Sequence, residues 1–212
     1  MRNKIARRSR AAIAVTATVV AVAGAIWVGV AAHARDSLSI YLDGQAFVCE
    51  SGTATFVERG QQSDEGTVPV IELTRDLDCT LRFHATNDGP LALEISRITI
   101  PSGGPQTSGG ASVVQLDGEF STAYPLAANA TDGSSGDAIV VLDSPIRFEP
   151  GESQFFQATL RYPPTPFMSE GAWEVVPHAP NATVSAWGIA GEREGERGGY
   201  GFLGTAESES DS

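Results

Sequence analysis

The sequence predicts an all-β protein, an antiparallel two-sheet β-sandwich preceded by one N-terminal transmembrane helix. Three observations predict it. An uncharged apolar stretch, residues 11–32, follows a basic start. Beyond residue 36, apolar and polar residues alternate in many short segments, as in strands with one buried face. Clusters of Gly, Pro, Asn and Asp separate these segments, and no amphipathic helix pattern interrupts them.

The apolar stretch is long enough to cross a membrane. As a helix, residues 11–32 would span roughly 33 Å, against about 30 Å for a hydrocarbon core. Five of the first ten residues are basic, whereas only Arg35 flanks the other end, and positive flanks stay in the cytoplasm. We therefore expect a cytoplasmic basic segment over 1–10, a signal-anchor over 11–34, and a C-terminal domain outside the cell membrane.

Cleavage of this helix is the alternative. Ala32-His33-Ala34 has the small-x-small form that signal peptidase accepts, and a cut after Ala34 would give a soluble, secreted domain. The apolar core is longer than the roughly 7 to 15 residues of a cleaved signal, which favours retention. Trp27 would then lie toward the outer interface, where an indole is favoured.

The exported part is strongly acidic. Residues 1–35 hold six of the 14 basic groups and none of the 26 acidic ones, so eight arginines remain against 26 carboxylates, a formal charge of −18. Such a surface repels nucleic acid, and we expect no nucleic-acid partner. Lys4 is the only lysine, which excludes Schiff-base chemistry from the exported domain.

Cys49 and Cys79 are the only cysteines, and an outward-facing compartment is oxidising, so we predict an intramolecular disulfide between them. Free thiols or a two-thiolate metal site are the alternatives. Two sulfurs make a poor zinc site, and no pair of histidines lies at ligand spacing, so we expect no metal.

The alternation predicts about nine or ten strands. The phase of the pattern changes around Arg97, which indicates a bulge or a strand that moves between sheets. The predicted strands are 38–43, 53–58, 68–74, 79–86, 91–100, 112–116, 138–142, 153–162, 172–176 and 183–189.

Two stretches resemble exported bacterial immunoglobulin-like domains. They are Cys79-Thr-Leu-Arg-Phe-His-Ala-Thr-Asn-Asp-Gly-Pro-Leu-Ala-Leu-Glu-Ile95 and Phe148-Glu-Pro-Gly-Glu-Ser-Gln-Phe-Phe156. The resemblance covers about half of the outer domain and implies an immunoglobulin-like sandwich, but no function. The chain departs from the antibody pattern because no Trp lies between Cys49 and Cys79, so an antibody-type core between the sheets is not implied.

The end of the chain differs in composition. We place the sandwich at 36–204 and expect 205–212, an acidic run with nothing apolar to bury, to be a disordered tail. Just before it, Tyr200 and Phe202 are expected in a short edge strand.

Candidate catalytic residues are few. His33 lies in the anchor, His84 alternates with polar residues on a strand, and His178 lies between two prolines in a predicted turn, so we interpret all three as non-catalytic. The chain has no Gly-x-Ser-x-Gly or Gly-x-x-x-x-Gly-Lys motif, and we expect no cofactor.

Two further motifs are interpreted as having no binding or modification role. The segment 132–137, Asp-Gly-Ser-Ser-Gly-Asp, offers oxygen ligands for Ca²⁺ but lacks the ordered spacing and terminal Glu of a calcium loop, so we interpret it as a turn. Asn129 and Asn181 begin glycosylation triplets, which rarely matter in bacteria.

The function expected from these features is binding rather than catalysis. We predict a non-enzymatic cell-envelope protein whose outer sandwich binds or scaffolds an unknown envelope protein or polymer, since loops on a rigid sandwich carry recognition. One alternative is an envelope hydrolase that uses an Asp/Glu pair. The other is a secreted binding domain cleaved after Ala34.

Overall fold

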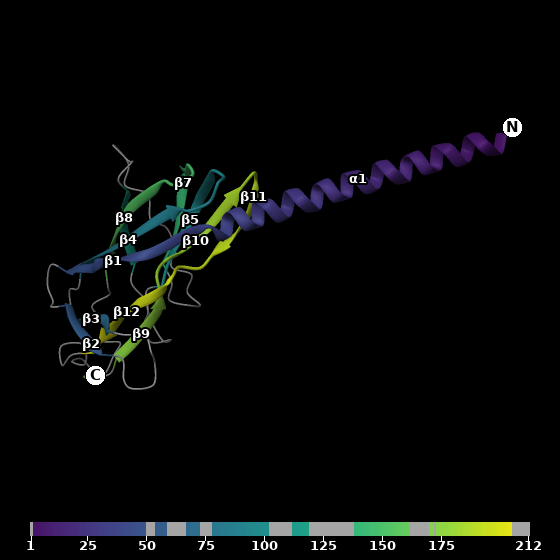
Figure 1. Cartoon of the computed structure of the whole chain (residues 1–212). Coiled ribbons are helices and arrows are strands. Elements are labelled where there is room, and N and C mark those ends of the chain that lie inside the picture. The colour runs from purple at the N-terminus through teal and green to yellow at the C-terminus, as the bar shows by residue number, and fades with distance from the viewer. Residues whose placement is uncertain are drawn as a thin grey trace.

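The protein consists of one long N-terminal helix followed by strands (Figure 1). The structure is a computed structural model that describes residues 2–49, 54–58, 67–72, 78–101, 112–118, 138–161, 170–171 and 173–204. Helix α1 covers Arg2–Asp36, so the basic segment continues the apolar helix without a break. The strands are β1 (Leu38–Cys49), β2 (Ala54–Glu58), β3 (Thr67–Glu72), β4 (Asp78–Asn87), β5 (Leu93–Ile100), β6 (Ser112–Gly118), β7 (Ala138–Phe148), β8 (Ser153–Arg161), β9 (Trp173–His178), β10 (Asn181–Ala186), β11 (Ile189–Arg193) and β12 (Arg197–Leu203).

In the described residues, the strands form three four-stranded sheets, with the orders β1-β4-β8-β6, β11-β10-β5-β7 and β2-β3-β12-β9. The prediction of a β-rich, largely antiparallel domain after one apolar helix is confirmed. The prediction of two sheets is wrong, because a third sheet forms at the end of the domain away from α1 (Figure 1), and its β3–β12 pair is parallel.

The first two sheets pack face to face around one core. Phe83 of β4 and Phe156 of β8 stack with ring centroids 5.0 Å apart, and Phe148 of β7 approaches Phe156 from the second sheet at 6.5 Å. The third sheet joins the same core through β12, where Tyr200 contacts Phe47 of β1 edge-on at 4.7 Å. All these rings are buried, as large aromatic side chains in a core are expected to be.

Strand β12 was expected at an edge but lies inside its sheet, between β3 and β9. Tyr200 and Phe202 are both fully buried. A strand whose aromatic rings are buried also has its backbone shielded from water. Pairing with a strand on each side then satisfies the hydrogen bonds of its backbone N–H and C=O groups. The expected tail, residues 205–212, lies outside the described residues.

The bulge predicted near Arg97 is confirmed. The register of β5 against β7 shifts between Ile95 and Arg97, and its register against β10 shifts between Thr183 and Val184 of β10. The extra residue lets β5 keep Ile95 and Ile98 in the core although three positions separate them.

Cys49 and Cys79 form a disulfide. The two residues lie opposite each other on β1 and β4, which are neighbours in one sheet, with Cα atoms 4.1 Å apart. In antibody domains the disulfide joins the two sheets instead. Here the disulfide joins the last residue of the edge strand β1 to its neighbour β4. It lies beyond the shift in register between Leu42 and Phe47.

Candidate functional site at the junction of helix and sandwich

The helix enters the sandwich through a junction of one residue. Helix α1 ends at Asp36 and β1 begins at Leu38, so only Ser37 lies between them. The Ser37 N–H and Oγ donate to the Ala34 carbonyl at 3.2 and 2.5 Å, which satisfies a carbonyl that the helix end leaves free. The Asp88 N–H donates to the Ser37 carbonyl at 3.0 Å and joins the β4–β5 turn to the junction.

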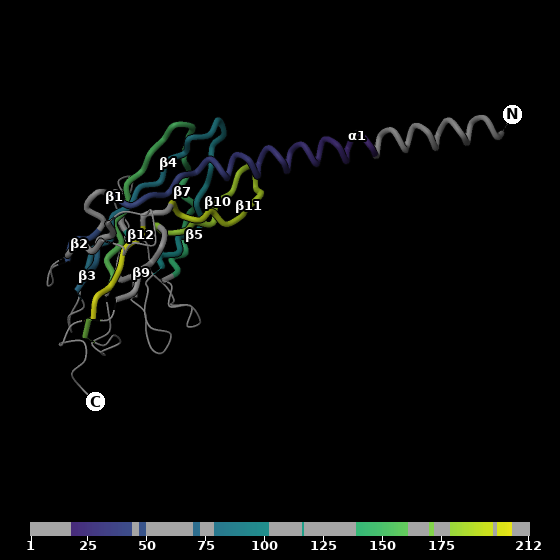
Figure 2. The backbone as a smooth tube through the Cα atoms, turned by 60° about the horizontal axis from the view of Figure 1, so that its bottom comes forward, coloured from purple at the N-terminus to yellow at the C-terminus, as the bar shows by residue number. Residues whose placement is uncertain are grey.

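The last turns of α1 belong to the core of the domain. Ala31 and Ala34 are 0% and 2% exposed and form part of the core cluster, whereas His33 between them is exposed. The helix contacts β10 and β11, and it leaves the sandwich beside this hairpin in both views (Figures 1 and 2). Alanine at these positions lets the helix approach the strands closely, so the end of α1 packs as part of the domain.

Two arginines complete the contact between helix and hairpin. The Arg35 guanidinium covers Gly191 of β11 so closely that a Cβ on Gly191 would lie 1.9 Å from Arg35 Nη1. Nε of Arg193 donates to the Leu38 carbonyl at 2.6 Å, which ties β11 to the start of β1. The junction is therefore held from both sides, by the β4–β5 turn and by β11.

Asn87 supports the junction from inside. It is fully buried at the end of β4. Its Nδ2 donates to the carbonyls of Leu91 and Phe148 at 2.8 and 3.2 Å, and its Oδ1 accepts the Gly89 N–H at 3.1 Å. Gly89 in turn packs on Ser37, since a Cβ there would lie 2.0 Å from Ser37 Oγ. The side chain thus fixes the turn that holds Ser37.

We expect Asn87→Ala to lower the free energy of unfolding by about 2 kcal/mol, because the variant leaves buried donors and acceptors without partners. Denaturant unfolding of the full chain in detergent would measure the change. The control is Thr86→Ala, whose hydroxyl makes an exposed hydrogen bond of 2.9 Å to Ser153, and its effect should stay below about 1 kcal/mol. Equal effects of the two variants would contradict the structural role of Asn87.

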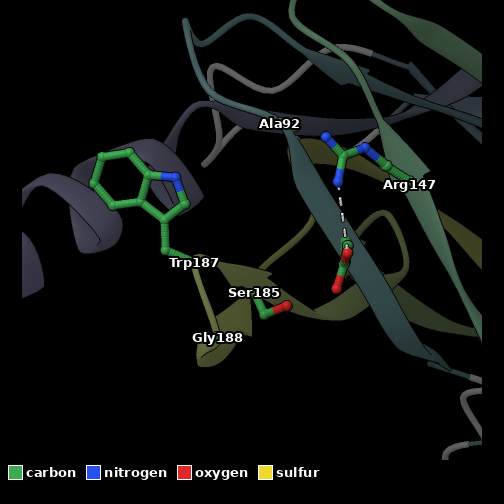
Figure 3. Close-up of a pocket in the computed structure, with 6 residues that line it drawn as sticks. Ala92, Arg147, Ser185, Trp187 and Gly188 are labelled. Atoms are coloured by element: carbon green, nitrogen blue, oxygen red, sulfur yellow. Dashed lines mark ion pairs between the residues drawn. The ribbon is translucent and has the colours of Figure 1, made fainter.

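A small pocket lies beside the junction, at the tip of the β10–β11 hairpin (Figure 3). Its volume is about 170 Å³, below the roughly 300 Å³ at which small-molecule sites begin. The residue before β5, the strands β5, β7 and β10, and the hairpin turn supply its walls, which are Ala92, Glu94, Arg147, Ser185, Trp187 and Gly188.

The hairpin turn itself has an unusual residue. Trp187 and Gly188 have φ angles of 49° and 78°, between the paired residues Ala186 and Ile189. Positive φ at both central positions is the pattern of a type I′ turn, which favours Asn or Gly at the first of them. A tryptophan held there costs about 1 to 3 kcal/mol of backbone strain. Its indole is also 50% exposed, so burial recovers only part of that cost.

The polar groups near this pocket mainly interact with one another. Arg147 Nε donates to Glu149 at 2.7 Å, and its Nη1 lies 3.9 Å from Glu94. The hydrogen bond and charge of Glu149 raise the pKa of Arg147. In the adjoining turn, the Glu149 N–H and the Gln154 amide hydrogen-bond Glu152 and hold its carboxyl pKa below the usual range. A general acid needs the opposite shift, so Glu152 does not suit that role.

The histidines expected to be non-catalytic lie apart. His33 is exposed on α1, and His178 ends β9 rather than lying in a turn. His84 is half-buried in a row of rings across three strands, with Tyr41 stacked on it at 5.3 Å and Phe155 at 4.9 Å. Tyr41 is stacked on His84 and Phe155 is tilted by 53° against it, and such cross-strand ring contacts stabilise a sheet.

The remaining predicted motifs give no site among the described residues. Asn181 is half-buried in β10, where its Oδ1 accepts the Gly195 N–H at 3.0 Å. Asn129 and the 132–137 segment lie outside the described residues. Within the part of the chain that the structure describes, no three His, Cys, Asp or Glu side chains gather as metal ligands would.

Asn87 and Trp187 were not singled out from the sequence. The sequence that begins at Asn87, Asn-Asp-Gly-Pro, is typical of a turn, but a turn residue is usually exposed and this one is buried. The signal for Trp187 was a glycine after it inside a predicted strand, 183–189, which in fact marks a turn between two strands.

Known proteins resemble the chain only distantly. No protein-family model matches it, and no curated protein matches it. Among solved structures, a protein assigned as ApaA from Bordetella pertussis is 17% identical over 78% of this chain and 96% of its own, with a TM-score of 0.32. Family 35 carbohydrate-binding modules from Clostridium thermocellum and from an environmental isolate are 9% and 10% identical, with TM-scores of 0.30 and 0.26. They cover 59% and 58% of this chain, and 95% and 87% of their own. Similarities of this size assign no function to the chain.

Proposed function

We propose that this is a non-enzymatic cell-envelope protein, which helix α1 keeps in the membrane and whose sandwich is held on the outer side to bind an envelope partner. The packing of Ala31 and Ala34 into the domain core carries the proposal. The described apolar part of α1, Thr18–Asp36, is long enough and apolar enough to cross a membrane, with a mean hydropathy of 1.5. The same length and hydropathy suit a signal peptide, so it is the packing of the helix end at the junction that favours an anchor.

Cleavage after Ala34 would remove both core alanines. The mature domain would begin at Arg35 and expose the surface that Ala31 and Ala34 cover, although a secreted domain is normally complete without its signal. The helix end also lacks an extended linker that would separate a signal from its cargo, since a single residue joins it to β1. These features favour an anchor that is retained and built into the fold.

With α1 kept in the membrane, the end of the sandwich opposite the junction would face away from it. The strand ends Asn87, Leu93 and Phe148 lie at the junction end, so Ile100 of β5 and Arg161 of β8 lie at the opposite end. Recognition at that outer end fits a domain whose other end is held at a membrane.

Retention of the anchor is tested by expressing the full chain and measuring its mass and its membrane association. We expect the full-length mass in the membrane fraction, resistant to alkaline carbonate, with the C-terminus accessible to protease from outside. A soluble species beginning at Arg35 would contradict the proposal.

Binding at the outer end is tested by photo-crosslinking in intact cells, because the exported domain has no lysine for amine-reactive reagents. A photoreactive residue in place of Val48, which is exposed at the far end of β1, should capture an envelope protein or polymer. The matched control replaces Asp88, which is exposed in the turn beside Ser37. Equal capture at both positions would contradict recognition by the outer end.

A further inference from the structure

We propose that Trp187 is a second membrane contact, an indole that the β10–β11 hairpin inserts into the headgroup interface of the outer leaflet beside α1. The inference rests on the proposed anchoring by α1. It concerns a different property, namely that the domain touches the bilayer at two points and is therefore held in one orientation on it.

The hairpin lies along the helix, at the end of the sandwich from which the helix leaves. Strands β10 and β11 both contact α1, and the two views agree on this placement (Figures 1 and 2). In the close-up, the indole of Trp187 points toward α1 and away from the ion pair of Arg147 and Glu94 (Figure 3). The ring is thus directed to the helix side of the hairpin rather than into the polar side of the pocket.

The tip of the hairpin reaches the apolar part of the helix. The Arg35 guanidinium covers Gly191, so Gly191 lies beside the last turns of α1, within the reach of that side chain. Three residues of strand from Gly191 to Gly188 extend about 10 Å, and a helix covers the same distance in about seven residues. Counted back from Arg35, that is the level of Val28 in α1.

At that level, the larger exposed side chains of α1 are all apolar. Ile26, Trp27, Val28 and Val30 are each between 41% and 61% exposed. A bilayer that covers these residues must also meet the hairpin tip beside them. Trp27 and Trp187 would then lie at similar depth, as the indoles of an aromatic belt do, with the ring in the apolar layer and its N–H among the headgroups.

The exposed indole suits lipid better than a soluble ligand. The pocket beside it is small, and Arg147 is already engaged with both Glu94 and Glu149. The exported domain carries a formal charge of −18 once the first 35 residues are set aside, so charged groups on it would repel an anionic leaflet. An uncharged indole is the kind of side chain with which such a domain can approach a membrane.

The test uses the full chain in phosphatidylcholine vesicles whose acyl chains are brominated near the headgroup, because bromine quenches indoles in contact with it. The chain has three tryptophans, so a Trp27→Phe, Trp173→Phe variant reports on Trp187 alone. We expect strong quenching and blue-shifted emission. Two matched variants leave only Trp27, which should also be quenched, and only Trp173, at the far end of β9, which should not.

The outcomes separate the two proposals. Quenching of Trp27 without quenching of Trp187 would overturn this inference and leave the anchor intact, whereas the absence of quenching at both would overturn the anchor as well. If Trp173→Phe impairs folding, Trp173 is kept, and the single variant Trp27→Phe is compared with the double variant Trp27→Phe, Trp187→Asn. Asn suits the turn, so the double variant should keep the fold and lose the quenchable fluorescence. If the double variant kept that quenchable fluorescence, the inference would also be overturned.

Discussion

Replacing both cysteines, Cys49→Ala with Cys79→Ala, is expected to lower the free energy of unfolding by about 3 to 4 kcal/mol. The disulfide closes a loop with a sequence separation of 30, and in the chain-entropy model that loop restricts the unfolded chain by this amount. For a domain of this size, each kcal/mol shifts the melting temperature by about 2 to 4 °C, so a fall of about 10 °C is expected.

The position of the bond gives the substitution a local effect as well. Strand β1 is an edge strand, and its register against β4 is interrupted between Leu42 and Phe47. Only a short paired segment, Phe47 to Cys49, lies beyond the interruption, and the disulfide ends it. Without the bond we expect this segment to exchange its amide hydrogens faster, while Leu38 to Leu42 keep their protection.

Thermal unfolding with and without reducing agent checks the prediction in the wild type, and hydrogen exchange checks the local effect. Val48→Ser is the matched control, because Val48 is exposed next to Cys49 and its loss should change stability by no more than about 0.5 kcal/mol. If reduction left the melting temperature unchanged, the bond would contribute nothing to the stability of the fold.

The class of the fold was predictable because it depends on local patterns. Alternation placed ten strand segments, and the phase change at Arg97 located the bulge in β5, since both follow from which face of a strand is buried. The number of sheets depends instead on pairings between distant strands. Nothing near Phe202 in the sequence indicates that it pairs in parallel with Ile71.

The candidate site was less predictable for the same reason. The length of the apolar stretch and the charges on its flanks indicated an N-terminal helix that could anchor the chain. That Ala31 and Ala34 pack against strands some 150 residues later could not be inferred, because alanines are frequent in membrane helices and carry no sign of a specific contact. The strain at Trp187 depends on a backbone angle, and a single sequence does not reveal it.

Placing a charge in the junction, Ala34→Asp, is expected to destabilise the full chain by about 3 kcal/mol. Ala34 is 2% exposed within the core cluster, so a carboxylate there would be desolvated. The control is His33→Asp, which adds a carboxylate to the exposed face of the same turn and should change stability by no more than about 0.5 kcal/mol. Denaturant unfolding in detergent, followed by near-ultraviolet circular dichroism, measures both.

The size of this effect is limited by how tightly the helix is docked, because the chain can avoid burying the charge by releasing the end of α1 from β10 and β11. A loss much smaller than 3 kcal/mol with faster exchange at Ser37 and Leu38 would show release of the helix rather than unfolding of the sandwich.

The same variant also distinguishes the anchored protein from a secreted one. If the chain were cut after Ala34, Asp at that position would block the cut and increase the mature mass. In the anchored protein the mass changes only by the substitution and the stability falls, so mass and stability measured on one variant separate a signal that is removed from a helix that is part of the fold.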